Sequence, residues 1–398
     1  MTNFITIIIP TRNRLEYLKH SIKTVLSQSY KNFNLIVVNN ECSDGTYEYL
    51  NTLNDERLRV INSNKYLCMT DNFLLGLNSI DQDGWFGVIG DDDGLLPDAL
   101  KCLNKLINQH DVEVIQCAKD YYRWDDIDGS KIKGGSIIIN GFFNVQPSYR
   151  DSFKNIKKCL YGEMDPLDFP RFYTGGFAST SLLSKLLNRD KHFIRSSIPD
   201  IYSSLVIGLN TERYLWYPTP LVMSGTSSKS NGTATFNKVN NPQKVNTTSN
   251  GFGAIPIHSK ISMDKFFFPN DNSVYLLESL YYYPEKHKLN IDMNKFIFNL
   301  CLRISISDTY SQAWIKNFLK ENSINLSIKN LGYYKFIYKC KKIPSRYLRK
   351  HMINKSNNYC PNIYEASLII NNYRKNKFIY KVLCYLINKT YSFLKFFH

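Results

Sequence analysis

Residues 85–97 read WFGVIGDDDGLLP, and this stretch indicates the class of fold. The apolar run 85–89 is typical of a strand that is buried on both faces of a parallel sheet. Three aspartates, Asp91, Asp92 and Asp93, follow it closely. Crowded carboxylates at the end of a buried strand need a positive charge, and a divalent cation with oxygen ligands is the common solution. The alternative is an acidic surface turn that caps a helix opening at Pro97.

The flanking sequence alternates strands with helices. Continuous apolar runs predict strands at 4–9, 33–38, 58–61 and 112–116, with Pro10 ending the first of them. Apolar residues at helical spacing predict helices at 15–26, 47–53, 73–80 and from Pro97 onward. This alternation predicts βαβ units, and therefore an α/β domain with a mostly parallel sheet.

Polar segments stand at the ends of three predicted strands. They are residues 10–13, 39–41 and 91–93. Ligands of such sheets bind beyond the carboxyl ends of the strands, so we expect the three segments to converge. The chain lacks GxGxxG and GxxxxGK[ST], which argues against a dinucleotide-binding fold and a P-loop phosphotransferase.

The composition is that of a globular protein with room for two or three domains, at 398 residues and 43% hydrophobic content. Nine cysteines include no CxxC pair, which favours reduced thiols in a cytosolic protein over a disulfide framework or a zinc site. The N-terminus lacks a basic segment and a cleavage site, so no signal peptide is expected. No apolar stretch reaches about 18 residues, so no membrane-spanning helix is expected.

Positive charge is concentrated at the C-terminal end. Residues 331–398 hold 14 Lys or Arg and one acidic residue, whereas the rest of the chain carries only +3 of the total charge of +16. This asymmetry predicts a polyanionic partner for the tail, either anionic lipid or nucleic acid.

Three blocks of sequence resemble family 2 glycosyltransferases of the GT-A fold. They are IIIPTRNR at 7–14, VVNNECSDGT at 37–46 and GDDDGLLP at 90–97, in the order and spacing of that family. The resemblance is strong over residues 4–120 and weaker to about 235. It implies a Rossmann-like sheet flanked by helices, a nucleoside-diphosphate sugar donor, Mn²⁺ or Mg²⁺, and inversion at the anomeric carbon.

The resemblance also implies roles for residues on the donor side. Pro10, Thr11, Arg12 and Asn13 would frame the nucleotide base. The aspartate that usually closes the second strand is replaced by Asn39 and Asn40, which keep a hydrogen-bond acceptor but lose the charge. A uridine nucleotide is the expected base.

The acidic block implies the metal ligands. The common pattern is Asp-x-Asp-Asp, and Gly90 occupies its first place here. On this alignment Asp93 is a metal ligand, Asp92 contacts the ribose or the donor sugar, and Asp91 is either a second ligand or a spectator. His258 is a candidate third ligand, with a purely structural role as the alternative.

An inverting transfer needs a general base on the acceptor side of the site. The acidic residues available between 120 and 235 are Asp120, Asp125, Asp126, Asp128, Asp151, Glu163, Asp165, Asp168, Asp190, Asp200 and Glu212. We choose Asp200, because family members place the base at the start of an apolar helix such as the one predicted after Pro199. The alternative is that Asp200 only caps this helix.

Two further segments have open interpretations. Tyr121, Tyr122 and Trp124 predict either an aromatic platform for the acceptor or ordinary packing. The Ser/Gly/Asn-rich loop 225–232 predicts either a cover over the diphosphate, with Lys229 as a cation, or a solvent-exposed linker.

We divide the chain into three regions. Residues 1–235 form the GT-A domain, with a nucleotide-sugar half (1–120) and an acceptor half (121–235). Residues 236–263 are a linker or loop, and 264–398 are a basic, aromatic-rich and largely helical region. Within it, 373–398 has six cations, no acids and interleaved apolar residues, which predicts a helix lying on an anionic membrane surface rather than an ordinary basic helix.

The predicted function is a hexosyltransferase-type enzyme of bacterial surface polysaccharide synthesis, such as O-antigen or capsule, acting on a glycan or polyprenyl-linked acceptor. It would be cytoplasmic and peripheral on the inner face of the cell membrane. A nucleotidyltransferase is one alternative, although the N-terminal block lacks the glycines of that class. A nucleic-acid-binding protein is another, but no such motif occurs and the body is nearly neutral, so nucleic acid is not an expected partner.

Overall fold

The computed structural model describes residues 1–126, 135–140, 146–196, 198–230, 271–284, 290–304, 309–324, 350–353 and 360–375. The predicted linker 236–263 and His258 lie outside these ranges. So does the predicted membrane-surface segment 373–398, apart from its first three residues.

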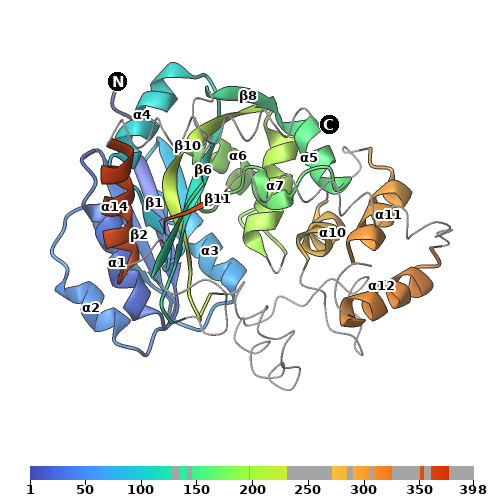
Figure 1. Ribbon diagram of the computed structural model, residues 1–398, viewed down its shortest axis with the longest axis horizontal. Coiled ribbons are helices and arrows are strands. Elements are labelled where there is room, and N and C mark those ends of the chain that lie inside the picture. Colours follow the sequence, from blue (N-terminus) through green and yellow to red (C-terminus); the bar gives the residue numbers. More distant parts are fainter. Residues whose placement is uncertain are drawn as a thin grey trace.

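Four parallel strands form the N-terminal half of the sheet. They are β1 (Ile5–Thr11), β2 (Phe33–Asn39), β3 (Leu58–Asn62) and β4 (Trp85–Val88), in the order β4-β1-β2-β3 (Figure 1). Successive residues of β1 serve different cores: Ile8 packs in one apolar cluster, and Ile7 and Ile9 pack in another. Burial on both faces explains why these strands read as unbroken apolar runs.

Beyond β4 the sheet becomes mixed. β9 (Gly176–Ser179) runs antiparallel between β4 and β6 (Val114–Arg123). The long β10 (Arg213–Thr226) pairs with β6 in parallel, and β7 (Ser136–Asn140) pairs with β6 antiparallel. The short strands β5 (Gly94–Leu95) and β8 (Ser148–Asp151) pair with β10, and β11 (Lys350–Ile353) pairs with β7. In the described ranges all eleven strands therefore belong to one sheet.

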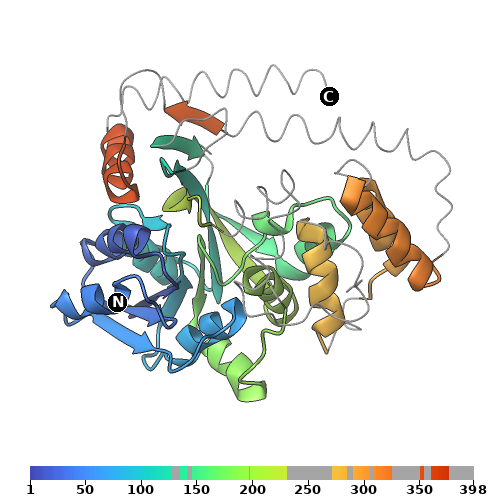
Figure 2. The same ribbon diagram turned by 90° about the horizontal axis from the view of Figure 1, so that it is seen from below.

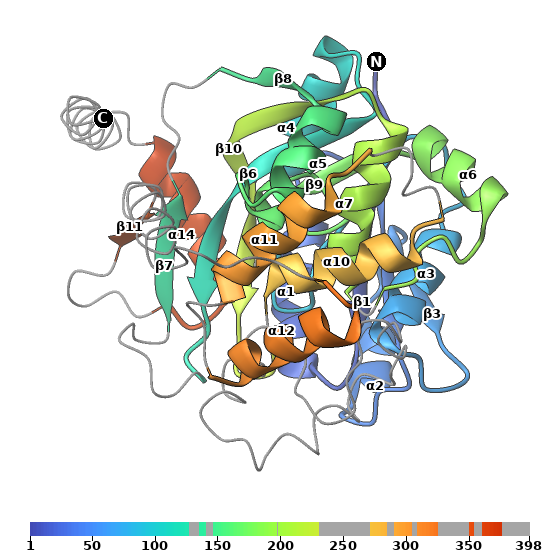
Figure 3. The same ribbon diagram turned by 90° about the vertical axis from the view of Figure 1, so that its right-hand side faces the viewer.

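Helices cover both faces of the sheet (Figure 3). One face is packed by α3 (Met69–Asn78), α5 (Ser152–Leu160), α6 (Thr180–Arg189) and α7 (Pro199–Asn210), with the short 3₁₀ helix η1 (Pro166–Asp168) nearby. The other face is packed by α1 (Leu15–Leu26), α2 (Thr46–Thr52) and α4 (Ala99–Gln109). The predicted α/β class and the order of its first elements are thus confirmed.

Two local predictions about proline are wrong. β1 continues through Pro10 to Thr11, because Pro10 pairs with Val38 and the Asn40 amide donates to the Thr11 carbonyl. Pro97 does not open α4, which begins at Ala99. The Leu96 amide donates to the Leu221 carbonyl at 2.9 Å, and this bond keeps the chain extended up to the proline.

The C-terminal part is largely helical, as predicted. α10 (Asn272–Tyr282), α11 (Met293–Ile304) and α12 (Thr309–Glu321) extend the core around α5 and α7. α14 (Ile363–Lys375) instead lies beside α1, on the other side of the molecule (Figure 2). Within the described ranges no helix is both long and apolar enough to cross a bilayer, and all seven cysteines there are free thiols.

Candidate functional site

Asp91 joins the first and third of the predicted polar segments. The Thr11 hydroxyl at the end of β1 donates to Asp91 Oδ2 at 2.8 Å. Arg14, the residue before α1, forms an ion pair with Asp91 Oδ1 at 2.9 Å. Asp91 is only 3% exposed, so its charge is neutralised inside the protein. The strand-end position of both segments in the parallel half produces this meeting.

Asp92 is held by the loop that follows β10. The Ser227 hydroxyl donates to Asp92 Oδ2 at 2.8 Å, and the Ser230 hydroxyl donates to the same atom. The indole Nε1 of Trp124 donates to the main-chain carbonyl of Asp92 at 3.1 Å. The described part of the loop therefore contacts Asp92, and its closure over a diphosphate stays a prediction.

Asp93 accepts hydrogen bonds from neutral donors on several elements. The amide of Gly90 donates to Oδ2 at 2.9 Å, and the amide of Gly225 donates to Oδ1 at 2.7 Å. The Thr174 hydroxyl also donates to Oδ2. Gly225 must be small, because a Cβ there would stand 1.7 Å from the Asp92 carbonyl oxygen. A Cβ on Gly90 would stand 2.6 Å from the Tyr173 hydroxyl and 3.0 Å from Asp93 Oδ2, so a side chain there would displace one of them.

The three carboxylates leave an excess of negative charge. Burial raises the pKa of Asp91, and burial together with the neighbouring Asp92 raises the pKa of Asp93 to about 6. Arg14 neutralises Asp91, whereas the hydrogen-bond donors to the side chains of Asp92 and Asp93 are uncharged. Arg14 also interacts electrostatically with Asp92, and Lys119 interacts with Asp93, but neither cation donates a hydrogen bond to these two carboxylates. A divalent cation would supply positive charge in direct contact with them.

A preformed metal cage is not present in the described ranges, where no three His, Cys, Asp or Glu side chains are grouped to hold an ion. The carboxylates of Asp91, Asp92 and Asp93 face different partners instead. The charge and the oxygen donors therefore fit a divalent cation, provided that it takes over contacts now made by hydroxyl groups such as Ser227.

The predicted base-binding residues lie at the adjacent strand ends. The Asn39 side chain donates to Asn62 Oδ1 at 2.8 Å and accepts from the Cys42 amide, and the Asn40 side chain bonds both main-chain groups of Leu67. Both amides thus organise the loops after β2 and β3. Their contact with a base stays a prediction.

Two residues before α1 shape the same region. Asn13 has a positive φ of 52° and accepts from the Ser43 amide, which ties the β1 end to the loop after β2. The guanidinium of Arg12 lies 3.5 Å from the centre of the Tyr66 ring. This stacked pair offers a flat surface beside the strand ends.

Asp200 occupies the second position of α7, directly after Pro199. The cap position is Ile198, which makes no side-chain cap bond, whereas Asp200 Oδ1 accepts a hydrogen bond from the Ile201 amide in the first turn at 3.0 Å. Asp200 Oδ2 lies 3.6 Å from the Nε of Arg171. The Arg171 side chain is 5% exposed and that of Asp200 is 20% exposed, so the carboxylate is the accessible member of the pair.

Lys119 of β6 adds a further cation on this side. Its electrostatic neighbours include Arg171, Asp93 and Asp200. Desolvation, reinforced by the charge of Arg171, lowers the pKa of Lys119 to about 7. Lys119 is therefore only partly charged near neutral pH, and Arg171 is the cation that faces Asp200.

Tyr121 and Tyr122 belong to β6 and Trp124 follows it directly, and Tyr121 is half-buried whereas the other two have a packing role. Tyr122 and Trp124 are 1% and 4% exposed and belong to an apolar cluster with α14. Neither presents an open ring face to an acceptor. Lys229 of the covering loop pairs with Glu16 at 2.6 Å, which holds the loop against α1.

Several site residues had no local signal in the sequence. Arg14 stands within the first block of family-like sequence, but its ion pair with Asp91 could not be inferred from spacing. Thr174 and Ser227 come from segments more than 80 residues after the acidic block and contact it only through the folded sheet.

An acidic cluster at the carboxyl end of a central parallel strand lies where α/β sheets bind their ligands, and its oxygen atoms suit a cation-dependent enzyme site. Residues 6–163 match the family model described as glycosyl transferase family 2. The N-terminal part of the chain is thus similar to glycosyltransferase family 2, and the observed sheet confirms the predicted α/β fold class.

A curated relative agrees with this assignment. The glycosyltransferase GlyG of Streptococcus pneumoniae serotype 4 is 23% identical over 183 residues, which are 41% of this chain. The aligned part spans about 60% of GlyG.

Two solved structures show weaker likeness. S. aureus TarS 1–349 in complex with UDP-GlcNAc aligns over 85% of this chain and 91% of that fragment, with 13% identity and a TM-score of 0.45. The mannosyltransferase PcManGT from Pyrobaculum calidifontis, in complex with GDP-Man and Mn²⁺, aligns over 87% and 88%, with 12% identity and a TM-score of 0.39. No substrate of this chain follows from likeness at this level.

Proposed function

We propose that the protein is a metal-dependent, inverting glycosyltransferase. It transfers a sugar from a nucleoside-diphosphate sugar, a UDP-sugar first of all, to a glycan or polyprenyl-linked acceptor in bacterial surface polysaccharide synthesis. The observation that carries the proposal is the burial of three carboxylates at the end of β4 with one paired arginine, Arg14. Together with the family match, it supports a site for a cation and a diphosphate.

On the donor side, Asp93 and either Asp91 or Asp92 would hold Mn²⁺ or Mg²⁺, with His258 as a further candidate ligand. The bound cation supplies positive charge that offsets the charge of the leaving diphosphate. Arg14 already neutralises Asp91, which favours Asp92 and Asp93 as the carboxylates that face the cation.

On the acceptor side, Asp200 acts as the general base. It accepts the proton of the acceptor hydroxyl while that oxygen bonds to the anomeric carbon from the face opposite the diphosphate. The bond from the anomeric carbon to the diphosphate oxygen breaks, and the electron pair leaves with the diphosphate. Arg171 holds Asp200 from its buried side and keeps one carboxylate edge toward the acceptor.

The activity is tested by a screen of nucleotide sugars with Mn²⁺. A glycosyltransferase releases a free nucleoside diphosphate, whereas a nucleotidyltransferase produces pyrophosphate from a nucleoside triphosphate. We expect one UDP-sugar to raise the melting temperature and to release UDP slowly without acceptor. Pyrophosphate release from a triphosphate, with no response to any nucleotide sugar, would refute the proposal.

We also propose that the basic C-terminal segment holds the enzyme on the inner face of the membrane. Residues 376–398 contribute Lys377, Lys381, Lys389 and Lys395, each worth about 1 kcal/mol near an anionic surface. Deleting 376–398 leaves α14 intact and is expected to reduce co-sedimentation with phosphatidylglycerol vesicles at least about tenfold. Neutral phosphatidylcholine vesicles are the control, and equal binding of both proteins to anionic vesicles would contradict the proposal.

A further inference from the structure

The C-terminal helix α14 returns to the sheet and packs behind the acidic residues. Ile363, Ala366 and Ile370 are fully buried and share an apolar cluster with Leu96 and Met223. A Cβ on Gly94, the residue after Asp93, would stand 3.5 Å from Ile363. The helix α14, some 270 residues later in the sequence, therefore packs beside Gly94, the residue that follows the acidic loop Asp91–Asp93.

A buried ion pair fastens the far end of α14. Arg374 lies 2.7 Å from Asp120 Oδ2, and the Asp120 side chain on β6 is fully buried. Removing a cation that contacts a buried carboxylate is unfavourable, so this pair opposes separation of α14 from β6.

The opposite end of the segment is tied to the acidic loop through two aromatic residues. The Tyr122 hydroxyl donates to the Cys360 carbonyl at 2.6 Å, and the rings of Tyr122 and Trp124 meet edge to face at 5.2 Å. Trp124 in turn donates to the main-chain carbonyl of Asp92. The contacts thus run continuously from α14 to the main chain between Asp92 and Gly94.

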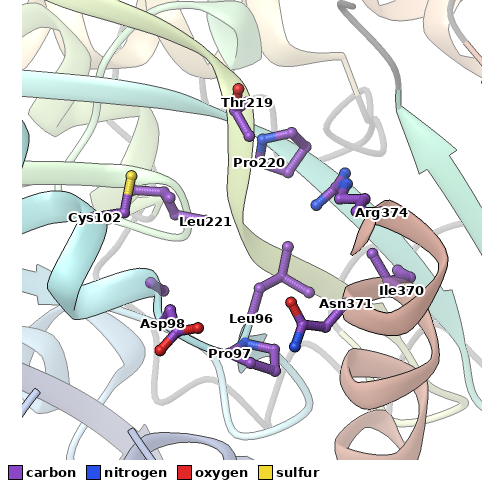
Figure 4. Close-up of a pocket in the computed structure, with 11 residues that line it drawn as sticks. Leu96, Pro97, Asp98, Cys102, Thr219, Pro220, Leu221, Ile370, Asn371 and Arg374 are labelled. Atoms are coloured by element: carbon purple, nitrogen blue, oxygen red, sulfur yellow. The ribbon is translucent and has the colours of Figure 1, made fainter. Parts of the chain in front are cut away.

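A small pocket remains between α14, the start of α4 and β10 (Figure 4). Leu96 and Pro97 line it on one side, Thr219 and Pro220 on another, and Asn371 and Arg374 on the helix side. Because packing is incomplete at this end, the Arg374–Asp120 pair contributes a larger share of the attachment there than it would in a filled interface.

We propose that α14 is a positioning element of the donor site and that Arg374 is the positioning residue that locks it to the sheet. The proposal rests on the metal-dependent donor site proposed above. With α14 attached, Asp92 and Asp93 are held ready for the cation and the diphosphate. With α14 loosened, part of the binding energy goes into ordering the loop, and the affinity for the metal–nucleotide pair falls.

The test measures binding of UDP with Mn²⁺ by calorimetry, well below the melting temperature and without sugar transfer. We expect Arg374→Gln to raise the Kd about tenfold. The double variant Asp120→Asn/Arg374→Gln replaces the ion pair by a neutral amide pair, and we expect it to bind within about threefold of wild type. Arg59→Gln is the matched control, because it removes the exposed ion pair between Arg59 of β3 and Asp81, which lie 2.8 Å apart.

Each outcome separates the two proposals. If wild type binds neither UDP nor GDP with Mn²⁺, the donor site itself is wrong. If wild type binds and Arg374→Gln lowers the melting temperature without changing the Kd, α14 is only a structural support and the positioning role is overturned. If Arg374→Gln does not fold, the double variant carries the test, and a Kd raised tenfold despite its neutral pair would also overturn the role of Arg374.

Discussion

Asp200→Asn is expected to lower the turnover of sugar transfer by about 10² to 10⁴, the usual contribution of a general base. The asparagine keeps the size of the side chain and an oxygen for the Ile201 amide, which now donates to Asp200 Oδ1 at 3.0 Å. It cannot accept the acceptor proton at neutral pH. Donor binding should be unchanged, because Asp200 lies on α7 and not on the strand ends that carry Asp91, Asp92 and Asp93. Steady-state release of the nucleoside diphosphate with saturating acceptor measures this effect.

The control for this variant is Asp83→Asn, which removes an exposed carboxylate before β4. It should transfer sugar at the wild-type rate. The loss of the Arg171 partner in Asp200→Asn is monitored by thermal melting, so that unfolding is not mistaken for lost catalysis. A folded Asp200→Asn enzyme with wild-type turnover would show that another residue is the base.

Removal of divalent cations is expected to lower the transfer rate about 10³-fold, which corresponds to about 4 kcal/mol of transition-state stabilisation. The physical reason is that Asp92 and Asp93 have only uncharged donors to their side chains, so the diphosphate would enter a site that repels it. EDTA treatment followed by titration with Mn²⁺ or Mg²⁺ measures the loss and its recovery. Full activity in EDTA would mean that Arg14 and Lys119 supply enough positive charge on their own.

The same titration should depend on pH through Asp93. Its pKa of about 6 means that a proton competes with the cation below this value, so the half-saturating Mn²⁺ concentration should rise as the pH falls from 7 to 5. The metal-free protein should respond in the opposite sense. A carboxyl whose pKa is raised on folding contributes stability below its ordinary pKa and loses it as the pH rises through about 6.

The local outline of the fold was predictable because it depends on short-range pattern. Ile7 and Ile8 point to opposite faces of β1, both faces are buried, and the apolar run therefore identified the strand. The position of the three aspartates could be predicted for the same reason, since only Gly90 separates Asp91 from such an apolar run. The prolines were misleading because a hydrogen bond from another strand, between Leu96 and Leu221, overrode the local preference of Pro97.

The roles of the carboxylates were only partly predictable. Their place at a strand end follows from the sequence, but which of them keeps a free charge depends on distant groups. Arg14 neutralises Asp91, and Thr174 and Gly225 bind Asp93 from segments that no spacing rule connects to it. Asp200 was found through the pattern of its helix, whereas its contact with Arg171 required the folded chain.

Neighbouring residues were enough to predict the alternation of strands and helices, the acidic strand end and the resemblance to family 2. The division of charge among Asp91, Asp92 and Asp93, and the return of α14 behind them, became visible in the folded chain, because burial and electrostatic pairing depend on distance in space. Arg374 and Asp120 are 254 residues apart in the sequence, yet they meet at 2.7 Å.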